Sequence, residues 1–399
     1  MNGDETREGL SDKARAALKV VLDRGEATRR IIGEDVGISL ATVTYLITEL
    51  EAAGLLVEIR REQGALGRST LVLGVAPSAG WVLGVDIGST QASYLARRLD
   101  GTTIASHTQR VAEAHSLESA RQAAGLTAEL LRVTSDSGPL LAVAIAVNHI
   151  APRSFDPSDI SPMTQITCDV VDTFLHDANI PKDVPILVEN NVNCGAVAEH
   201  DNGVMQGHAD CAYMQIGVRM GLGFFADGIL IRGGHGAGGE LAQIPLSWSA
   251  DVPPSVGAIE QAFSTEGLLA TAVDNWPAGE PVPESTEDLF LRAQEGHPVA
   301  ADVIRRHAVA LARVAVAAAT VIDPDVLVVG GGLSRATGFV DMMQQEFDSH
   351  RTQVKLVASE KGSGASVEGA VILARDLALS RLLYPHHHPL LPRPALYLS

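Results

Sequence analysis

Two polar turns in this 399-residue chain carry groups that could bind phosphates or hydroxyls, because each follows an apolar run. The run Trp81 to Val85 leads into Asp86-Ile87-Gly88-Ser89-Thr90, an acid and a glycine followed by two hydroxyls. Such a turn presents backbone N–H groups to a phosphate while its carboxylate orients a metal or a water. The run Val184 to Val188 leads into Glu189-Asn190-Asn191-Val192-Asn193, and a glycine-rich loop covers Gly233 to Glu240.

The residues near the N-terminus indicate a different chemistry, because this region carries hydroxyls and arginines instead of the acids and amides of the two turns. A polar helical face carries small hydroxyl and aromatic groups that reach base edges and phosphates, and a Gly-punctuated basic segment follows it. The candidate DNA-binding residues are Thr42, Thr44, Tyr45, Thr48, Arg60, Arg61 and Arg68.

The elements that position these residues follow from start and stop signals along the first 75 residues. Ser11-Asp12 starts a helix that Gly25 closes, Thr28 caps a second helix through Val36, and Ser39 caps a third to about Ala53. In the third helix one stripe is apolar at helical spacing. A strand at 55–57, a basic hairpin and a strand from Thr70 complete a winged helix-turn-helix. A three-helix packing module with no DNA partner is the alternative. The stripe comprises Val43, Leu46, Ile47 and Leu50.

Charge and composition limit the classes of function. The net charge is -18, but residues 1–80 hold 10 Lys+Arg and 12 Asp+Glu (10 - 12 = -2), so the rest of the chain is the acidic part. DNA binding therefore requires local basic patches and a dimer. No run of eighteen apolar residues occurs, which predicts a cytoplasmic protein without a membrane span. The 3 cysteines are far apart, so neither a disulfide framework nor a cysteine zinc site is expected.

From Trp81 onward, hairpins come first and strands then alternate with helices. Asp100-Gly101 and Asp227-Gly228 mark hairpins. This order predicts two linked α/β domains with a cleft between them. The expected helices are 117–133, one starting near Gly195, and 299–322; the expected strands are 81–85, 140–147, 184–188, 211–216 and 326–329.

The chain resembles the ROK family (repressor, open reading frame, kinase) of the sugar-kinase and actin-like superfamily. The resemblance rests on DIGST at Asp86, ENNVN at Glu189, GGHGAGGEL at Gly233, GAIEQAFS at Gly257 and DPDVLVVGGGLS at Asp323, in this order. An N-terminal winged helix marks the repressor branch of this family. Repressors of that branch often carry a Gly-Arg-Pro that touches the minor groove, and in this chain Gly67-Arg68-Ser69 stands at that place.

The resemblance implies an α/β fold of an N-terminal winged helix-turn-helix and two sugar-kinase-like, actin-like domains. The domains expected are 1–75, 81–195 and 196–383, with the C-terminal helix returning to the first α/β domain. Residues 384–399 are expected to be a disordered Pro/His tail.

The resemblance also implies lost chemistry. Asn191 stands at the position of the catalytic carboxylate, and an amide has no basic lone pair for a sugar proton. Val218 and Arg219 replace a threonine and a glycine of the phosphate loop, which disfavours ATP. Gln243 and Ala258 replace zinc ligands, so no metal and no cofactor is expected.

What remains is a candidate effector site for a sugar or sugar derivative. Acids and amides together suit a neutral polyol, which needs many directional donors and acceptors. The residues that match sugar-binding positions of the family are Asn190, Asn191, Glu240 and Glu260, and Gln243 could supply one further polar contact in place of the family's histidine.

The sequence thus predicts a sugar-responsive repressor that binds double-stranded operator DNA as a homodimer or homotetramer and is not an enzyme. An active ATP-dependent sugar kinase and a ligand-independent DNA-binding regulator are the alternatives.

Overall fold

The computed structural model describes residues 7, 9–63, 69–111, 116–134, 136–156, 158, 160–245, 255, 257–350, 353–384 and 395–397. The chain divides into two compact units. One comprises Met1–Glu189 with Ala370–Ser399, and the other comprises Asn190–Gly369.

The N-terminal part of the first unit contains three helices, α2 (Asp12–Arg24), α3 (Arg29–Val36) and α4 (Leu40–Ala52). Their expected caps are present, because each cap side chain accepts a hydrogen bond from a backbone N–H three residues later. The distances are 3.2 Å for Ser11, 3.3 Å for Thr28 and 3.3 Å for Ser39.

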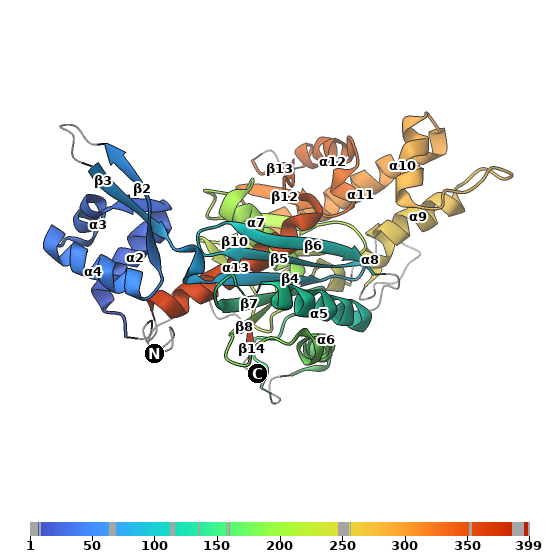
Figure 1. Ribbon diagram of the computed structural model, residues 1–399. Helices are drawn as coiled ribbons and strands as arrows, with labels where there is room; N and C mark the ends of the chain where they lie inside the picture. The colour runs from blue at the N-terminus through green and yellow to red at the C-terminus, as the bar shows by residue number, and fades with distance from the viewer. Residues whose placement is uncertain are drawn as a thin grey trace. The chain divides into compact units, whose positions relative to one another are not determined.

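A small antiparallel sheet completes this part, with β3 (Ser69–Val75) between β1 (Glu26–Thr28) and β2 (Leu56–Gln63). Strand β2 is longer than the three residues expected at 55–57. The helices and the sheet, which are blue in Figure 1, enclose an apolar core. Fully buried members include Leu18, Val21, Ile32, Val43, Ile47, Leu50, Leu55 and Leu73.

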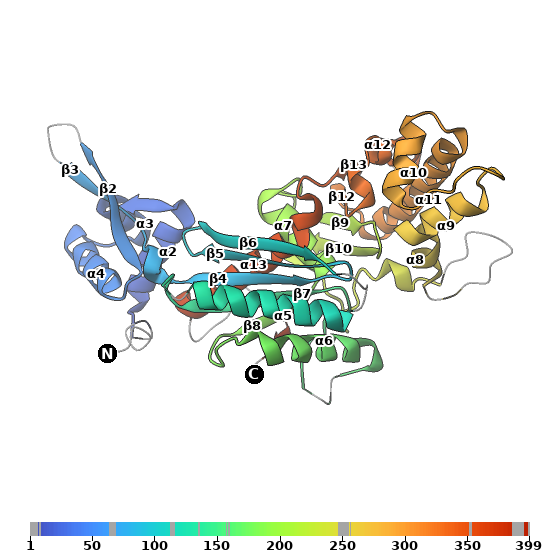
Figure 2. The same cartoon turned by 45° about the vertical axis from the view of Figure 1, so that its right-hand side comes forward.

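The rest of the first unit is built on a six-stranded sheet with the order β14-β8-β7-β4-β5-β6. Its strands are β4 (Trp81–Ile87), β5 (Gln91–Arg98), β6 (Thr103–Arg110), β7 (Leu140–Val147), β8 (Ile186–Asn190) and β14 (Ala395–Tyr397). Helices α5 (Ser116–Val133) and α6 (Pro162–Ala178) lie side by side on it, as Figure 2 shows. Alternate β4 side chains pack into the core that the two helices cover, as expected for a strand with one face toward that layer.

Strand β14 shows that the expected disorder does not hold for Ala395–Tyr397. Ala395–Tyr397 pair antiparallel with Ile186–Val188 and extend the sheet at its edge. The backbone N–H and C=O groups of an edge strand are open to such pairing, whatever the proline content around the added segment. His386, His387 and His388 lie outside the described residues.

The second unit has a five-stranded sheet with the order β11-β10-β9-β12-β13. Helix α7 (Asn191–Asn202) packs on one side of it, and the helices from α8 to α12 share the core on the other. The strands are β9 (Cys211–Gln215), β10 (Gly221–Ala226), β11 (Ile229–Leu230), β12 (Val326–Gly330) and β13 (Lys355–Ala358). The helices are α8 (Ala258–Phe263), α9 (Thr265–Asp274), α10 (Thr286–Gln294), α11 (Pro298–Ile322) and α12 (Phe339–Asp348).

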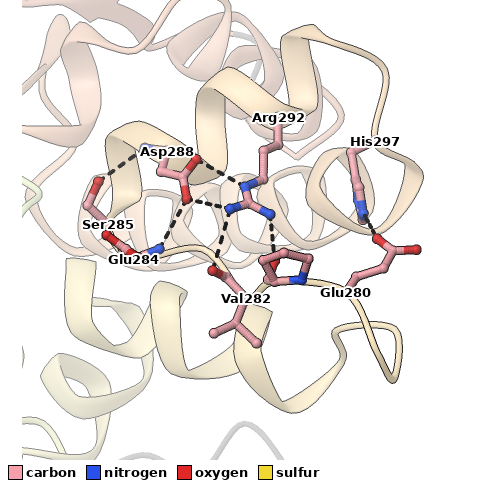
Figure 3. Close-up of polar contacts among 8 residues, drawn as sticks. Glu280, Val282, Glu284, Ser285, Asp288, Arg292 and His297 are labelled. Carbon is pink, nitrogen blue, oxygen red and sulfur yellow. Dashed lines mark hydrogen bonds and ion pairs between the residues drawn. The ribbon is translucent and has the colours of Figure 1, made fainter.

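Polar contacts fasten the connection from α9 to α10 (Figure 3), in addition to the burial of Trp276 and Pro283. Arg292 binds Asp288 through both Nε and Nη2, at 3.0 and 2.9 Å, and its Nη1 donates to the carbonyl of Pro281 at 2.6 Å. His297 Nε2 lies 2.9 Å from Glu280 Oε2. These contacts fasten the loop to α10 and to the start of α11.

Helix α13 (Ala365–Leu383) begins in the second unit and, from Ala370 onward, belongs to the first. Within the described ranges no single helix is long and apolar enough to cross a membrane; only the pair α3 and α4, bent by 108°, passes that test together.

Candidate functional site

Helix α4 presents one open face from the N-terminal module. Its apolar stripe, Val43, Leu46, Ile47 and Leu50, is buried as the helical spacing predicted. On the opposite side Thr44, Tyr45 and Thr48 are exposed, and Tyr45 is 71% exposed. The module therefore holds these three side chains together on one solvent-facing surface, which is the geometry a recognition helix requires.

The hydroxyls on this helix are committed to local hydrogen bonds. Thr44 Oγ1 donates to the carbonyl of Leu40 at 2.9 Å, and Thr48 Oγ1 donates to the carbonyl of Thr44 at 3.1 Å. Thr42 is half-buried, and its Oγ1 lies 3.0 Å from Ser39 Oγ at the helix cap. Thr42 thus belongs to the N-terminal cap, whereas Thr44 and Thr48 lie on the open face.

The arginines of strand β2 already have acidic partners within the module. Arg60 binds Glu26 and, at 2.7 Å, Glu62, while Arg61 Nε binds Glu58 Oε1 at 2.6 Å. The hydrogen bond from Arg61 holds the pKa of Glu58 below its usual value. Because the pairs are exposed, they are weak and can exchange for a phosphate.

These acidic partners were not predicted from the sequence. Alternating charge along β2 hinted at Glu58 and Glu62, but Glu26 lies 34 positions from Arg60 in the chain. Arg68 falls outside the described residues, so its contribution stays a prediction.

In the second unit, Asn190 positions the start of helix α7. Its Oδ1 accepts hydrogen bonds from the backbone N–H groups of Val192 and Asn193, at 2.8 and 3.4 Å. The prediction that the helix begins near Gly195 is wrong, because this side-chain cap allows it to begin at Asn191. Asn191 is half-buried in the first turn.

Two carboxylates and one guanidinium gather near the start of strand β10. Glu260 Oε2 accepts from the backbone N–H of Met220 at 3.3 Å, and its Oε1 lies 4.0 Å from Arg219 Nη1. Burial raises the pKa of Glu240, the negative charge of Glu260 adds to that effect, and Arg219 opposes it. Such a cluster offers both donors and acceptors to a hydroxyl-bearing ligand.

Strand β10 connects the two groups of candidate effector residues. A Cβ on Gly221 would lie 2.8 Å from Val192 Cγ2, so this strand runs tightly against the first turn of α7. The backbone N–H of Leu222 donates to the carbonyl of Gly239 at 2.9 Å, which places the loop before Glu240 beside the same strand. Gln243 is exposed at the end of a short 3-10 helix, and its backbone N–H donates to the carbonyl of Glu240 at 3.0 Å.

Comparisons with solved structures extend the likeness to most of the chain. A ROK family transcriptional regulator, a homolog of the E. coli MLC protein, superposes with a TM-score of 0.70 at 20% identity, over 96% of this chain and 98% of its own. A ROK glucokinase from Streptomyces griseus, solved with glucose and AMPPNP, has a TM-score of 0.57 at 22% identity and covers 74% of this chain and 99% of its own. At these identities the likeness shows the fold.

Sequence comparisons separate full-length from partial relatives. A xylose repressor from Caldicellulosiruptor bescii is 23% identical over 396 residues, covering 91% of this chain and 95% of the repressor. The bifunctional enzyme NanE/NanK of Brucella melitensis is 29% identical over 192 residues, which are 48% of this chain and 35% of that enzyme. The chain thus spans about a third of the length of that enzyme.

The family assignment rests on a match that covers most of the body. The model of the ROK family matches residues 82–377, beginning just after the winged-helix module. The sheets and helices described above, which resemble those of ROK regulators and kinases alike, agree with it. Because this match covers well over half of the chain, the protein belongs to the ROK family.

Proposed function

We propose that this chain is a transcriptional repressor that binds operator DNA through α4 and the wing, which is the hairpin of β2 and β3. A sugar or sugar derivative modulates this binding, and the protein is not a kinase. The observation that carries the proposal is the N-terminal module, in which α4 exposes Thr44, Tyr45 and Thr48 beside a strand that bears Arg60 and Arg61. Relatives of nearly full length named xylose repressor support it.

The residues at the start of α7 support the loss of kinase activity. A kinase needs a group that accepts a proton from the sugar hydroxyl. Asn191 stands where the family resemblance puts that group, and an amide does not supply it. The Asn190 side-chain oxygen is used to cap the helix.

The effector site rests on Glu240 and Glu260 beside β10, together with Asn190 and Asn191 at the start of α7. Burial raises the pKa of Glu240, and its carboxyl oxygens can accept hydrogen bonds from the hydroxyls of a neutral ligand. The protein would act in the cytoplasm as a dimer that binds an operator with two-fold symmetry. Ligand binding would then shift the population of DNA-binding conformations of this dimer.

The test is a fluorescence-polarisation titration of the full chain with DNA from around its own gene, with and without each member of a panel of sugars. We expect sequence-specific binding that at least one sugar weakens, and a Glu240→Gln variant that binds DNA normally but loses the sugar response. Absence of sequence-specific binding in every condition would overturn the repressor proposal.

Two rival functions are distinguished by separate measurements. An active sugar kinase would release ADP over the same sugar panel in a coupled assay, and Asn190→Ala would abolish that release. A ligand-independent regulator would bind its operator normally while calorimetry detects neither sugar nor nucleotide.

A further inference from the structure

The open face of α4 carries no charged side chain over its first two turns. Its outward positions follow helical spacing and are occupied by alanine, threonine and tyrosine. Of the acids on the helix, Glu49 Oε1 accepts the backbone N–H of Ser11 at 3.0 Å, on the side that faces α2. The residues that make up this face are Ala41, Thr44, Tyr45, Thr48 and Ala52, with Leu40 at its edge and Glu51 in its last turn.

What the two threonines present outward is decided by their hydrogen bonds. Each hydroxyl donates to a carbonyl one turn back along α4, at 2.9 Å for Thr44 and 3.1 Å for Thr48. The only hydrogen that each hydroxyl can donate is thereby used. Each hydroxyl oxygen can then still accept a hydrogen bond but not donate one, and the methyl group is the apolar part of the side chain that remains for an outside partner.

In the major groove, an outward surface of methyl groups has one matching feature on the bases. Thymine carries a C5-methyl group there, and apolar contacts from alanine and threonine methyls recognise it. Guanine, by contrast, is read by arginine or lysine, and adenine by asparagine or glutamine. None of these side chains occurs between Leu40 and Ala52.

We propose that this protein reads its operator chiefly through thymine methyl groups, with Thr44 and Thr48 as the specificity-determining residues. The inference rests on the proposed function, since it requires that α4 enters a major groove. Arg60 and Arg61 on the neighbouring strand are the matching contacts for the phosphate backbone. The first two turns of α4, which carry no charged side chain, then select the sequence, while Arg60 and Arg61 on β2 supply attraction that does not depend on sequence.

The experiment uses the full chain and a random double-stranded library, from which the bound duplexes are selected and sequenced. The best duplex is then synthesised with deoxyuridine in place of each thymidine in turn. This exchange removes one methyl group and leaves every hydrogen-bonding group of the base in place. Exchanges in the flanking sequence serve as the control for altered DNA stiffness.

We expect affinity to fall about fourfold for each contacted methyl group that is removed, and to stay unchanged for flanking exchanges. Thr44→Ser and Thr48→Ser, which lose the methyl and keep the hydroxyl, should lower affinity for the thymine duplex by the same factor. Neither variant should bind more weakly when the contacted base is already uracil. Thr44→Val keeps the methyl and should retain the discrimination.

A matched control is available on α11. Thr320 is also an exposed helical threonine whose Oγ1 donates one turn back, to the carbonyl of Val316 at 2.7 Å. Thr320→Ser should leave DNA binding unchanged.

The outcomes separate this inference from the function on which it rests. If duplexes are enriched but thymine and uracil forms bind equally, methyl reading is wrong and the repressor proposal stands. If no duplex is enriched, both fail. If Tyr45→Asp dissociates an oligomer of the free protein, the α4 face packs against a second copy, and the inference is overturned.

Discussion

Replacing Arg15 with methionine tests how the winged-helix module is held to the rest of the first unit. Arg15 lies in α2 and is only 6% exposed. Its Nε donates to the carbonyl of Leu10 at 3.3 Å, its Nη2 to that of Arg7 at 3.2 Å, and its Nη1 to that of Leu382 in the last turn of α13. One buried guanidinium therefore joins the N-terminal segment to the C-terminal helix. Methionine keeps the length of the apolar stem and removes the donors.

The expected cost is about 2 kcal/mol. Three carbonyls lose a charged donor, at about 1.5 kcal/mol each for a net hydrogen bond to a charged group, and relief from burying the guanidinium offsets more than half of that loss. A difference of about 2 kcal/mol corresponds to a roughly thirtyfold change in a local opening equilibrium. Because the chain has two units, a single global unfolding free energy does not describe it.

Hydrogen exchange followed by mass spectrometry measures this local effect. We expect faster exchange in Arg15→Met both at the start of α2 and in the last turn of α13, with α4 and β4 unchanged. Arg24→Met is the matched control, since Arg24 lies at the exposed end of the same helix and pairs with Asp35. Faster exchange confined to α2, with the end of α13 unaffected, would refute a stabilising contact between Arg15 and Leu382.

Three further predictions concern the wing, the glycine loop and a buried histidine. Glu58→Gln frees Arg61, so in a polarisation titration non-specific DNA should bind more tightly and the slope of log K against log salt should steepen by about 0.9. Gly239→Ala should destabilise the second unit by more than about 2 kcal/mol, because φ is +86° and the new Cβ would lie 1.7 Å from the carbonyl oxygen of Leu222. Thermal unfolding measures this loss, and the unfolding temperature of the control Gly234→Ala, whose new Cβ would lie in open space, should stay unchanged. Burial lowers the pKa of His307 from 6.5 to about 4, so its neutral form stabilises the fold above pH 6.5 and this contribution disappears as the pH falls toward 4. Between pH 7 and pH 4 the unfolding free energy of the second unit should therefore fall by up to about 3 kcal/mol more in the wild type than in His307→Gln.

The N-terminal module shows how far local signals extend. Ser11, Thr28 and Ser39 cap the three helices as expected, since a cap is a contact between residues three positions apart. The buried stripe of α4 followed from helical spacing for the same reason. Which hydroxyls remain available was not visible in the sequence, because a threonine can bond to its own helix or face outward.

The start of α7 and the added strand β14 show where local signals fail. The side chain of Asn190 caps α7, so the helix starts at Asn191 rather than near Gly195 as the sequence predicted. Ala395–Tyr397 pair with a strand about 200 positions earlier in the chain, a choice that propensity near the prolines does not make.

By itself, the sequence determined the order and type of the elements, the winged helix and the family motifs, because caps, periodicity and turn residues act over a few positions. Only the tertiary structure decided the contacts between distant segments: Arg60 with Glu26, Arg15 with Leu382, and Glu260 with Arg219 across 41 positions. The physical reason is that charge pairing and burial depend on which surfaces meet in space. The order of residue types along the chain does not specify which surfaces meet in the folded protein.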